Sequence, residues 1–278
     1  MAQKELISAK YQKRFIVILA AVVLIESVCS FIFAAQNEYL LNASDGVLQS
    51  LIANIALPVL LFVLAFLAIG KATSRLWRTT LALVWASAGM LVNSLAVTCA
   101  YLFQIFVVRS EGFVLTNYLY IPLVATAVLY AIGLLLWVRS GNGQKTTLVS
   151  KGFQRAYIIM AMVYVLTQLA YLVVNFAQYG ISFELTPILY MYAPIVLTVG
   201  LAIAGYIYLK PLKSRLQRLF FSSLGVAIAF YVGSAINSLN LFTLTDMYQI
   251  FDVLATVISI ITFAIFVRVV RKELSRKA

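Results

Sequence analysis

Charged residues are scarce in this chain, and histidine is missing from it. Of its 278 residues 11% are charged and 63% are hydrophobic, and the mean hydropathy is +0.99. A soluble globular domain carries about 25% charged residues, so this composition indicates a membrane protein. Without histidine the chain lacks the commonest metal ligand, the usual haem ligand and the general base of most catalytic triads. We therefore expect no metal and no cofactor.

Cysteine and the usual nucleotide motifs are also scarce. Cys29 and Cys99 are the two cysteines, and both lie in apolar segments, so we expect no disulfide framework. There is no Walker-type phosphate loop, and no lysine lies in the middle of an apolar segment to carry a Schiff base. These absences disfavour an enzyme and leave no catalytic residue to name.

Long apolar segments fill most of the chain. Each has about 20 residues or more, which is enough to cross a hydrocarbon core of about 30 Å as a helix. We predict an all-α polytopic membrane protein, with eight transmembrane helices near 14–36, 49–70, 78–103, 117–139, 154–178, 187–209, 218–241 and 247–269. These segments leave little room for a soluble domain.

The net charge of +12 gathers in alternate loops. Lysine and arginine precede the first segment, follow the last, and occupy every second loop between them. The remaining loops hold Glu38, Asp45, Glu111, Glu184 and Asp246, with Arg109 as their single basic residue. Short basic loops stay in the cytoplasm. We therefore predict a cell-membrane protein with both termini cytoplasmic. Its partner is the lipid bilayer, and we expect no nucleic-acid partner.

The two halves of the chain resemble each other. The first contains SRLWR from Ser74 and then GMLVNSL from Gly89, and the second contains SRLQR from Ser214 and then GSAINSL from Gly233. The first and fifth segments align as VLIESVCSFIFAAQ and VLTQLAYLVVNFAQ. We predict a parallel tandem repeat of two four-helix halves, 1–140 and 141–278, related by a pseudo-two-fold axis along the membrane normal.

Proline and a weaker motif recur in the same order. Pro58 and Pro194 lie well inside the second and sixth predicted segments, where each is expected to interrupt the helix. The fourth and eighth segments share LVATAV and VLATVI.

Glu26 is an acid near the middle of the first segment, and the alignment pairs it with Gln168. An ion at the bilayer centre costs about 2.5 to 3.5 kcal/mol on insertion scales. No lysine or arginine lies at that depth, so we expect a neutral carboxyl that is hydrogen-bonded to another helix. A proton-linked transport step and a structural hydrogen bond both remain open.

Other polar residues follow one helix face or recur in both halves. In the fifth segment the steps of three and four place Tyr157, Tyr164, Gln168, Tyr171, Asn175 and Gln178 on one side, as a cavity lining or a helix seam. Asn93 and Asn237 occupy repeat-equivalent positions, and Gly225, Ala229 and Gly233 precede Asn237 as a packing ridge. Asp252 is expected near the outer boundary, facing water.

Two functions fit these patterns. The first is a small-solute transporter or permease with a polar path between the halves, for substrate or protons, lined by Glu26, Gln168, Tyr171, Asn175, Asn93 and Asn237. The second is a non-catalytic membrane subunit or scaffold that binds lipid or partner helices and uses the same residues for packing. A hydrated path reaching these residues would separate the two.

Overall fold

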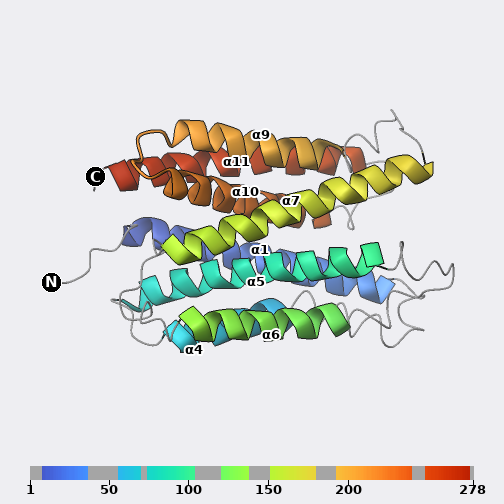
Figure 1. Ribbon diagram of the computed structural model, residues 1–278, viewed down its shortest axis with the longest axis horizontal. Coiled ribbons are helices and arrows are strands. Elements are labelled where there is room, and N and C mark those ends of the chain that lie inside the picture. The colour runs from blue at the N-terminus through green and yellow to red at the C-terminus, as the bar shows by residue number, and fades with distance from the viewer. Residues whose placement is uncertain are drawn as a thin grey trace. The chain divides into compact units, whose positions relative to one another are not determined.

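All regular structure in the described part of the chain is helical. The computed structural model describes residues 8–36, 56–69, 74–103, 120–137, 151–179, 192–239 and 248–275, although some side chains inside these ranges are not described. The eight helices there are α1 (Ala9–Gln36), α4 (Leu57–Ile69), α5 (Arg75–Phe103), α6 (Tyr120–Trp137), α7 (Lys151–Tyr179), α9 (Ala193–Tyr208), α10 (Arg215–Ser238) and α11 (Tyr248–Ser275) (Figure 1). The predicted all-α class is confirmed, and each helix overlaps one predicted segment.

The chain divides into two compact units, Met1–Ser150 and Lys151–Ala278. In the first unit α5 contacts α1, α4 and α6, and α4 also contacts α6. In the second unit α10 contacts α7, α9 and α11, and α9 also contacts α11 (Figure 1). The third described helix of each unit, α5 or α10, is therefore its central helix.

Apolar side chains fill the interior of each unit. In the first, α4 packs against α5 and α6, and the buried residues of these helices include Leu61, Ala65 and Ile69 on α4, Trp77 and Leu81 on α5, and Tyr130 on α6. In the second, the core of α10 and α11 includes Phe220, Phe221, Leu224, Phe263 and Val267, and the rings of Phe220 and Phe221 pack 5.1 Å apart. Such side chains stay out of contact with lipid or water whatever surrounds the unit.

The helices also leave large apolar side chains exposed. Examples are Val63 and Leu67 on α4, Leu129 and Leu135 on α6, Met162 and Leu166 on α7, Val196 and Ile203 on α9, and Val257 and Ile265 on α11. Among the described residues two stretches, Arg215–Asn237 and Ile250–Leu274, are long and apolar enough to cross a membrane, and four shorter apolar helices accompany them. The count of eight crossings stays a prediction.

Pro58 and Pro194 each lie in the first turn of a described α-helix. Pro58 is the second residue of α4 and Pro194 is the second residue of α9, and a π-helical residue, Ala56 or Tyr192, directly precedes each helix. Proline is tolerated in a first turn because the backbone N–H that it lacks has no intrahelical partner there. The α geometry is thus interrupted beside each of these prolines.

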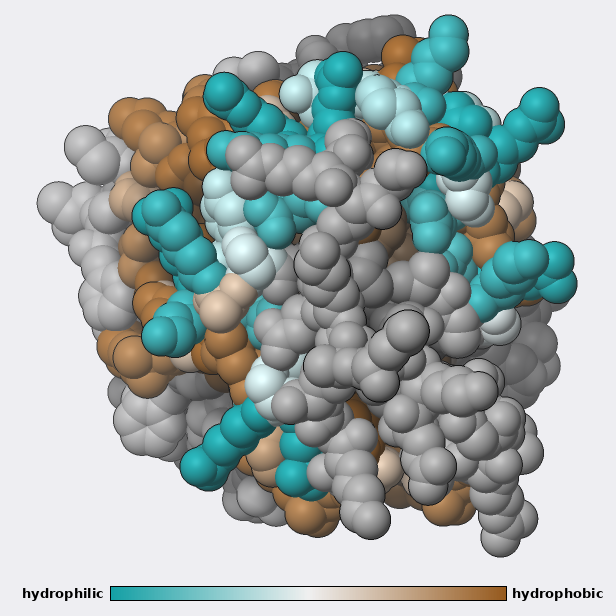
Figure 2. Space-filling view, turned by 90° about the vertical axis from the view of Figure 1, so that its left-hand side faces the viewer, coloured by the Kyte–Doolittle hydropathy of each residue, from teal (hydrophilic) through white to brown (hydrophobic). Residues whose placement is uncertain are grey.

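Basic side chains mark one end of the helices. The turn between α9 and α10 carries Lys210 and Lys213, and Arg271 near the end of α11 lies beside it, with its guanidinium carbon 4.6 Å from the ring centroid of Tyr208. Figure 2 shows hydrophilic side chains projecting from this end and hydrophobic residues along the flanks. This pattern agrees with a basic loop next to an apolar, lipid-facing surface.

Candidate functional site

The predicted pathway residues are only partly covered by the structure. The side chains of Glu26, Tyr171 and Asn175 lie outside the described ones, although α1 and α7 include their backbones. Gln168, Asn93 and Asn237 are described, and all three are half-buried. A pathway through all six residues therefore stays a prediction.

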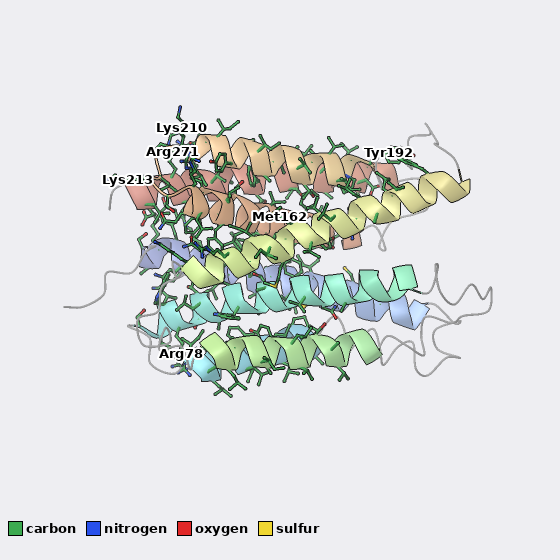
Figure 3. All side chains as sticks on the ribbon, viewed as in Figure 1. Arg78, Met162, Tyr192, Lys210, Lys213 and Arg271 are labelled. Carbon is green, nitrogen blue, oxygen red and sulfur yellow. The ribbon has the colours of Figure 1, made fainter. Side chains whose placement is uncertain are left out.

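The predicted polar stripe of α7 faces the interior of its unit where it is described. Tyr157 is fully buried, and its ring meets that of Phe220 on α10 edge to face at 5.4 Å. Tyr164 and Gln168 are half-buried, whereas Met162 and Leu166 are each 60% exposed (Met162 is labelled in Figure 3). The helix thus turns its polar residues inward and an apolar face outward.

In the first unit the polar groups beside α5 have partners. The Thr126 hydroxyl on α6 donates to Asn93 Oδ1 at 3.3 Å, and the Tyr130 hydroxyl donates to the Leu61 carbonyl on α4 at 3.0 Å. Gly89 makes this approach possible, because an added Cβ would lie 2.8 Å from Leu61 Cδ1 and 2.9 Å from the Tyr130 ring. Asn93 therefore contributes to the contact between α5 and α6.

In the second unit the predicted small-residue ridge packs against α11. A Cβ added at Gly225 would lie 2.7 Å from the Phe266 ring, and one added at Gly233 would overlap Ser259 Oγ and lie 3.1 Å from the Ala255 carbonyl oxygen. Ala229, between them, is fully buried. The interpretation of this ridge as a packing feature is confirmed.

The same contacts bring Asn237 to the level of Asp252. From Gly225 to Gly233 the residues met on α11 run backward from Phe266 to Ala255, so the two helices are antiparallel. Asn237 is one turn beyond Gly233, and Asp252 is about one turn before Ala255. These two polar side chains therefore share one level of the α10–α11 interface.

The expectation that Asp252 faces water is wrong, because its side chain is only 8% exposed. Its Oδ2 is buried without a hydrogen-bond partner, and the same is true of Asn237 Oδ1. Two hydrogen-bond acceptors are thus enclosed at one level, and the described residues supply no donor to either oxygen.

Two glutamines that the predicted pathway omits are among the most buried polar residues. Gln12 on α1 and Gln154 on α7 are each 1% exposed. Gln12 precedes Glu26 by the same number of residues as Gln154 precedes Gln168, so continuing the repeat alignment toward the chain start pairs them. The side-chain nitrogen and oxygen of Gln154 find no partner among the described residues. Extending the alignment would have revealed both.

The loop motif shared by the halves also has a shared geometry. Ser74 Oγ accepts from the Trp77 amide at 3.0 Å, and Ser214 Oγ accepts from the Gln217 amide at 3.4 Å, so a serine caps the start of both α5 and α10. Arg78 lies over the Phe66 ring, and Arg218 lies over the Tyr206 ring. In both units the arginine follows its aromatic partner by the same number of residues in the sequence.

Comparison with known proteins gives no relative: no family model, no curated protein and no solved structure matches the chain. Within the described ranges no group of three or more histidine, cysteine, aspartate or glutamate side chains is placed to hold a metal ion. The function must therefore be argued from the residues themselves.

Proposed function

We propose that the chain is a cell-membrane protein with eight spanning helices and both termini in the cytoplasm. The exposed apolar side chains of α4, α6, α7, α9 and α11 support this proposal, because they suit a lipid environment. The position of Lys210, Lys213 and Arg271 at one end of the second unit supports a cytoplasmic assignment for that end (Figure 3).

The tandem repeat, with halves 1–140 and 141–278, is part of the same proposal. Three similarities within the separate units support it: a central helix that is third among the described ones, a serine cap followed by an arginine over an aromatic ring, and a proline in the first turn of α4 and of α9. If the two halves were unrelated, all three similarities would have to arise independently and in the same order along the chain.

For the activity, we infer a small-solute transporter or permease whose polar path includes Asn237 and the other predicted pathway residues. One observation carries this inference: Asn237 Oδ1 and Asp252 Oδ2 are buried without a donor in a helical unit with an apolar exterior. A buried polar group without a partner costs about 1 to 3 kcal/mol. A polar ligand or water in a path would remove that cost.

Cysteine accessibility tests this function. In a background with Cys29→Ala and Cys99→Ala, Asn237→Cys is treated in proteoliposomes with a membrane-impermeant cationic thiol reagent. Val257→Cys is the matched control, because Val257 lies on the same helical pair but is exposed on the apolar face of α11. A hydrated path predicts modification at 237 and none at 257. No modification at either position contradicts the path, and equal modification contradicts the membrane placement.

The non-catalytic subunit or scaffold is the second candidate, and the first unit favours it. Asn93 there accepts from Thr126, so its amide oxygen needs no solute or water. Under this alternative Asn237 also belongs to a dry seam, so a cysteine at 237 stays unmodified. Solute flux should then be absent from proteoliposomes that contain the purified chain alone.

A further inference from the structure

The level shared by Asn237 and Asp252 has an excess of acceptors. The buried Asn237 Oδ1 and Asp252 Oδ2 each lack a donor. The nearby hydroxyl of Ser259 is already used, because it donates to the Ala255 carbonyl at 2.8 Å. Two enclosed oxygens, one of them on a carboxyl group, favour a positively charged or strongly donating species between them.

The first unit shows the contrast. Asn93 is the repeat-equivalent of Asn237, and its Oδ1 accepts from the Thr126 hydroxyl at 3.3 Å. The second unit replaces this satisfied amide with an amide oxygen and a carboxyl oxygen that lack donors. If this acceptor pair served packing alone, it would lower the stability of the interface, because neither oxygen regains the hydrogen bonds that it loses on burial. Apolar residues at the same positions would avoid that cost.

No described basic side chain is close enough to compensate Asp252. On α10 the arginines are Arg215 and Arg218, and the latter precedes Asn237 by about 28 Å of helix. On α11 the basic residues begin at Arg268, about 24 Å of helix beyond Asp252. Lys210 and Lys213 lie at that same far end (Figure 3). The carboxyl group therefore has no counter-charge nearby on α10, on α11 or in the turn between α9 and α10.

We propose that Asp252 and Asn237 bind one small monovalent cation, either an alkali-metal ion or a primary ammonium group. A single carboxylate balances a single charge, and carboxylate and amide oxygens suit both alkali ions and ammonium donors. A calcium ion normally takes about six to eight oxygen ligands, which is more than this level offers. The binding of a cation does not depend on the transporter function proposed above. A role of this pair as the coupling-ion site or the substrate site does rest on that function.

Thermal unfolding of the purified full-length protein tests this binding, because a ligand that binds only the folded state raises the unfolding temperature. The protein is heated in sodium, potassium or methylammonium chloride, and N-methyl-D-glucamine chloride holds the ionic strength constant. We expect a saturable rise in Tm with at least one small cation and none with the bulky one. Comparing the rise in Tm in sodium or potassium chloride with the rise in methylammonium chloride distinguishes an alkali-metal ion from a primary ammonium group.

Variants locate the effect. Asp252→Asn should abolish the cation-dependent rise, and Asn237→Leu should weaken the apparent affinity by at least tenfold. Gln154→Leu is the control, since it removes another buried amide of the same unit that has no partner among the described residues and lies outside the predicted path, and it should leave the response unchanged. Asp252→Glu keeps the charge but moves the carboxylate, and should change the order of preference among the cations. This last variant remains informative if Asp252→Asn does not fold.

Three results would overturn the site. They are a wild-type Tm that does not depend on small cations, a rise of equal size in Asp252→Asn, and an unchanged cation preference in Asp252→Glu. A rise that depends on Asp252 without any solute flux in proteoliposomes would leave the cation site standing and count against the transporter alone.

Discussion

The guanidinium carbon of Arg78 lies 4.0 Å from the centroid of the Phe66 ring, and Arg78 Nε donates a 2.6 Å hydrogen bond to the Phe66 carbonyl. That carbonyl belongs to the last turn of α4, where carbonyl groups have no intrahelical donor. One side chain at the start of α5 therefore both caps α4 and covers its last aromatic ring. Arg218 stacks on Tyr206 at 5.1 Å, but its Nε has no hydrogen-bond partner among the described residues.

Replacing the two arginines with lysine should separate these contributions. Lysine keeps the charge but loses the planar stacking group and the directed Nε donor. We expect Arg78→Lys to lower the free energy of unfolding by about 1 to 3 kcal/mol and Arg218→Lys by less than about 1 kcal/mol. Thermal unfolding of the purified variants measures both. Arg75→Lys, at an exposed position, is the control, and a larger loss from Arg218→Lys would contradict the assignment.

Gly233→Ala should destabilise the second unit, because its methyl group would overlap Ser259 Oγ beside the Ala255 carbonyl. Overpacking of this kind costs about 1 to 3 kcal/mol. Gly200→Ala is the matched control: no atom lies within 4 Å of its added Cβ, and alanine favours a helix by up to about 1 kcal/mol. Unfolding midpoints in a detergent titration compare the two variants.

A second substitution tests whether the clash is the cause. Adding Ser259→Ala to Gly233→Ala removes the overlapping oxygen and should restore part of the stability, while the Ala255 carbonyl at 3.1 Å prevents full recovery. If the single variant Gly233→Ala is as stable as the wild type, α10 and α11 do not pack as closely as described.

The helices were predictable from the sequence because apolar length is a property of each segment alone. The starts of α5 and α10 follow from the capping serines Ser74 and Ser214 for the same local reason. The burial of Asp252 was not predictable, because it depends on which face of α11 meets α10, and that is decided by side chains of both helices. The alignment contained a usable signal for Gln12 and Gln154, but only beyond the apolar stretch where the repeat is easiest to see.

The Thr126–Asn93 hydrogen bond should contribute little by itself. In a double-mutant cycle of Asn93→Leu and Thr126→Val we expect a coupling energy of about 0.6 kcal/mol, and at most about 1.7 kcal/mol, as for other hydrogen bonds between membrane helices. Unfolding free energies of the four proteins give the coupling. A value near zero would indicate that the 3.3 Å contact is not a stabilising bond, and Asn93 would then be free for another role.

Glu26→Gln tests whether Glu26 on α1 takes part in a proton-linked transport step or forms a structural hydrogen bond. Glutamine keeps the shape and the hydrogen-bonding capacity, and the aligned position in the second half already holds Gln168. If Glu26 carries a proton during transport, the variant should fold normally but lose the pH dependence of solute flux, because an amide does not ionise. Flux into proteoliposomes is measured at a series of pH values. Gln168→Glu is the matched variant, since it adds a second ionisable group at the aligned position. Flux that depends on pH to the same extent in wild type and Glu26→Gln would assign Glu26 to a structural hydrogen bond between helices.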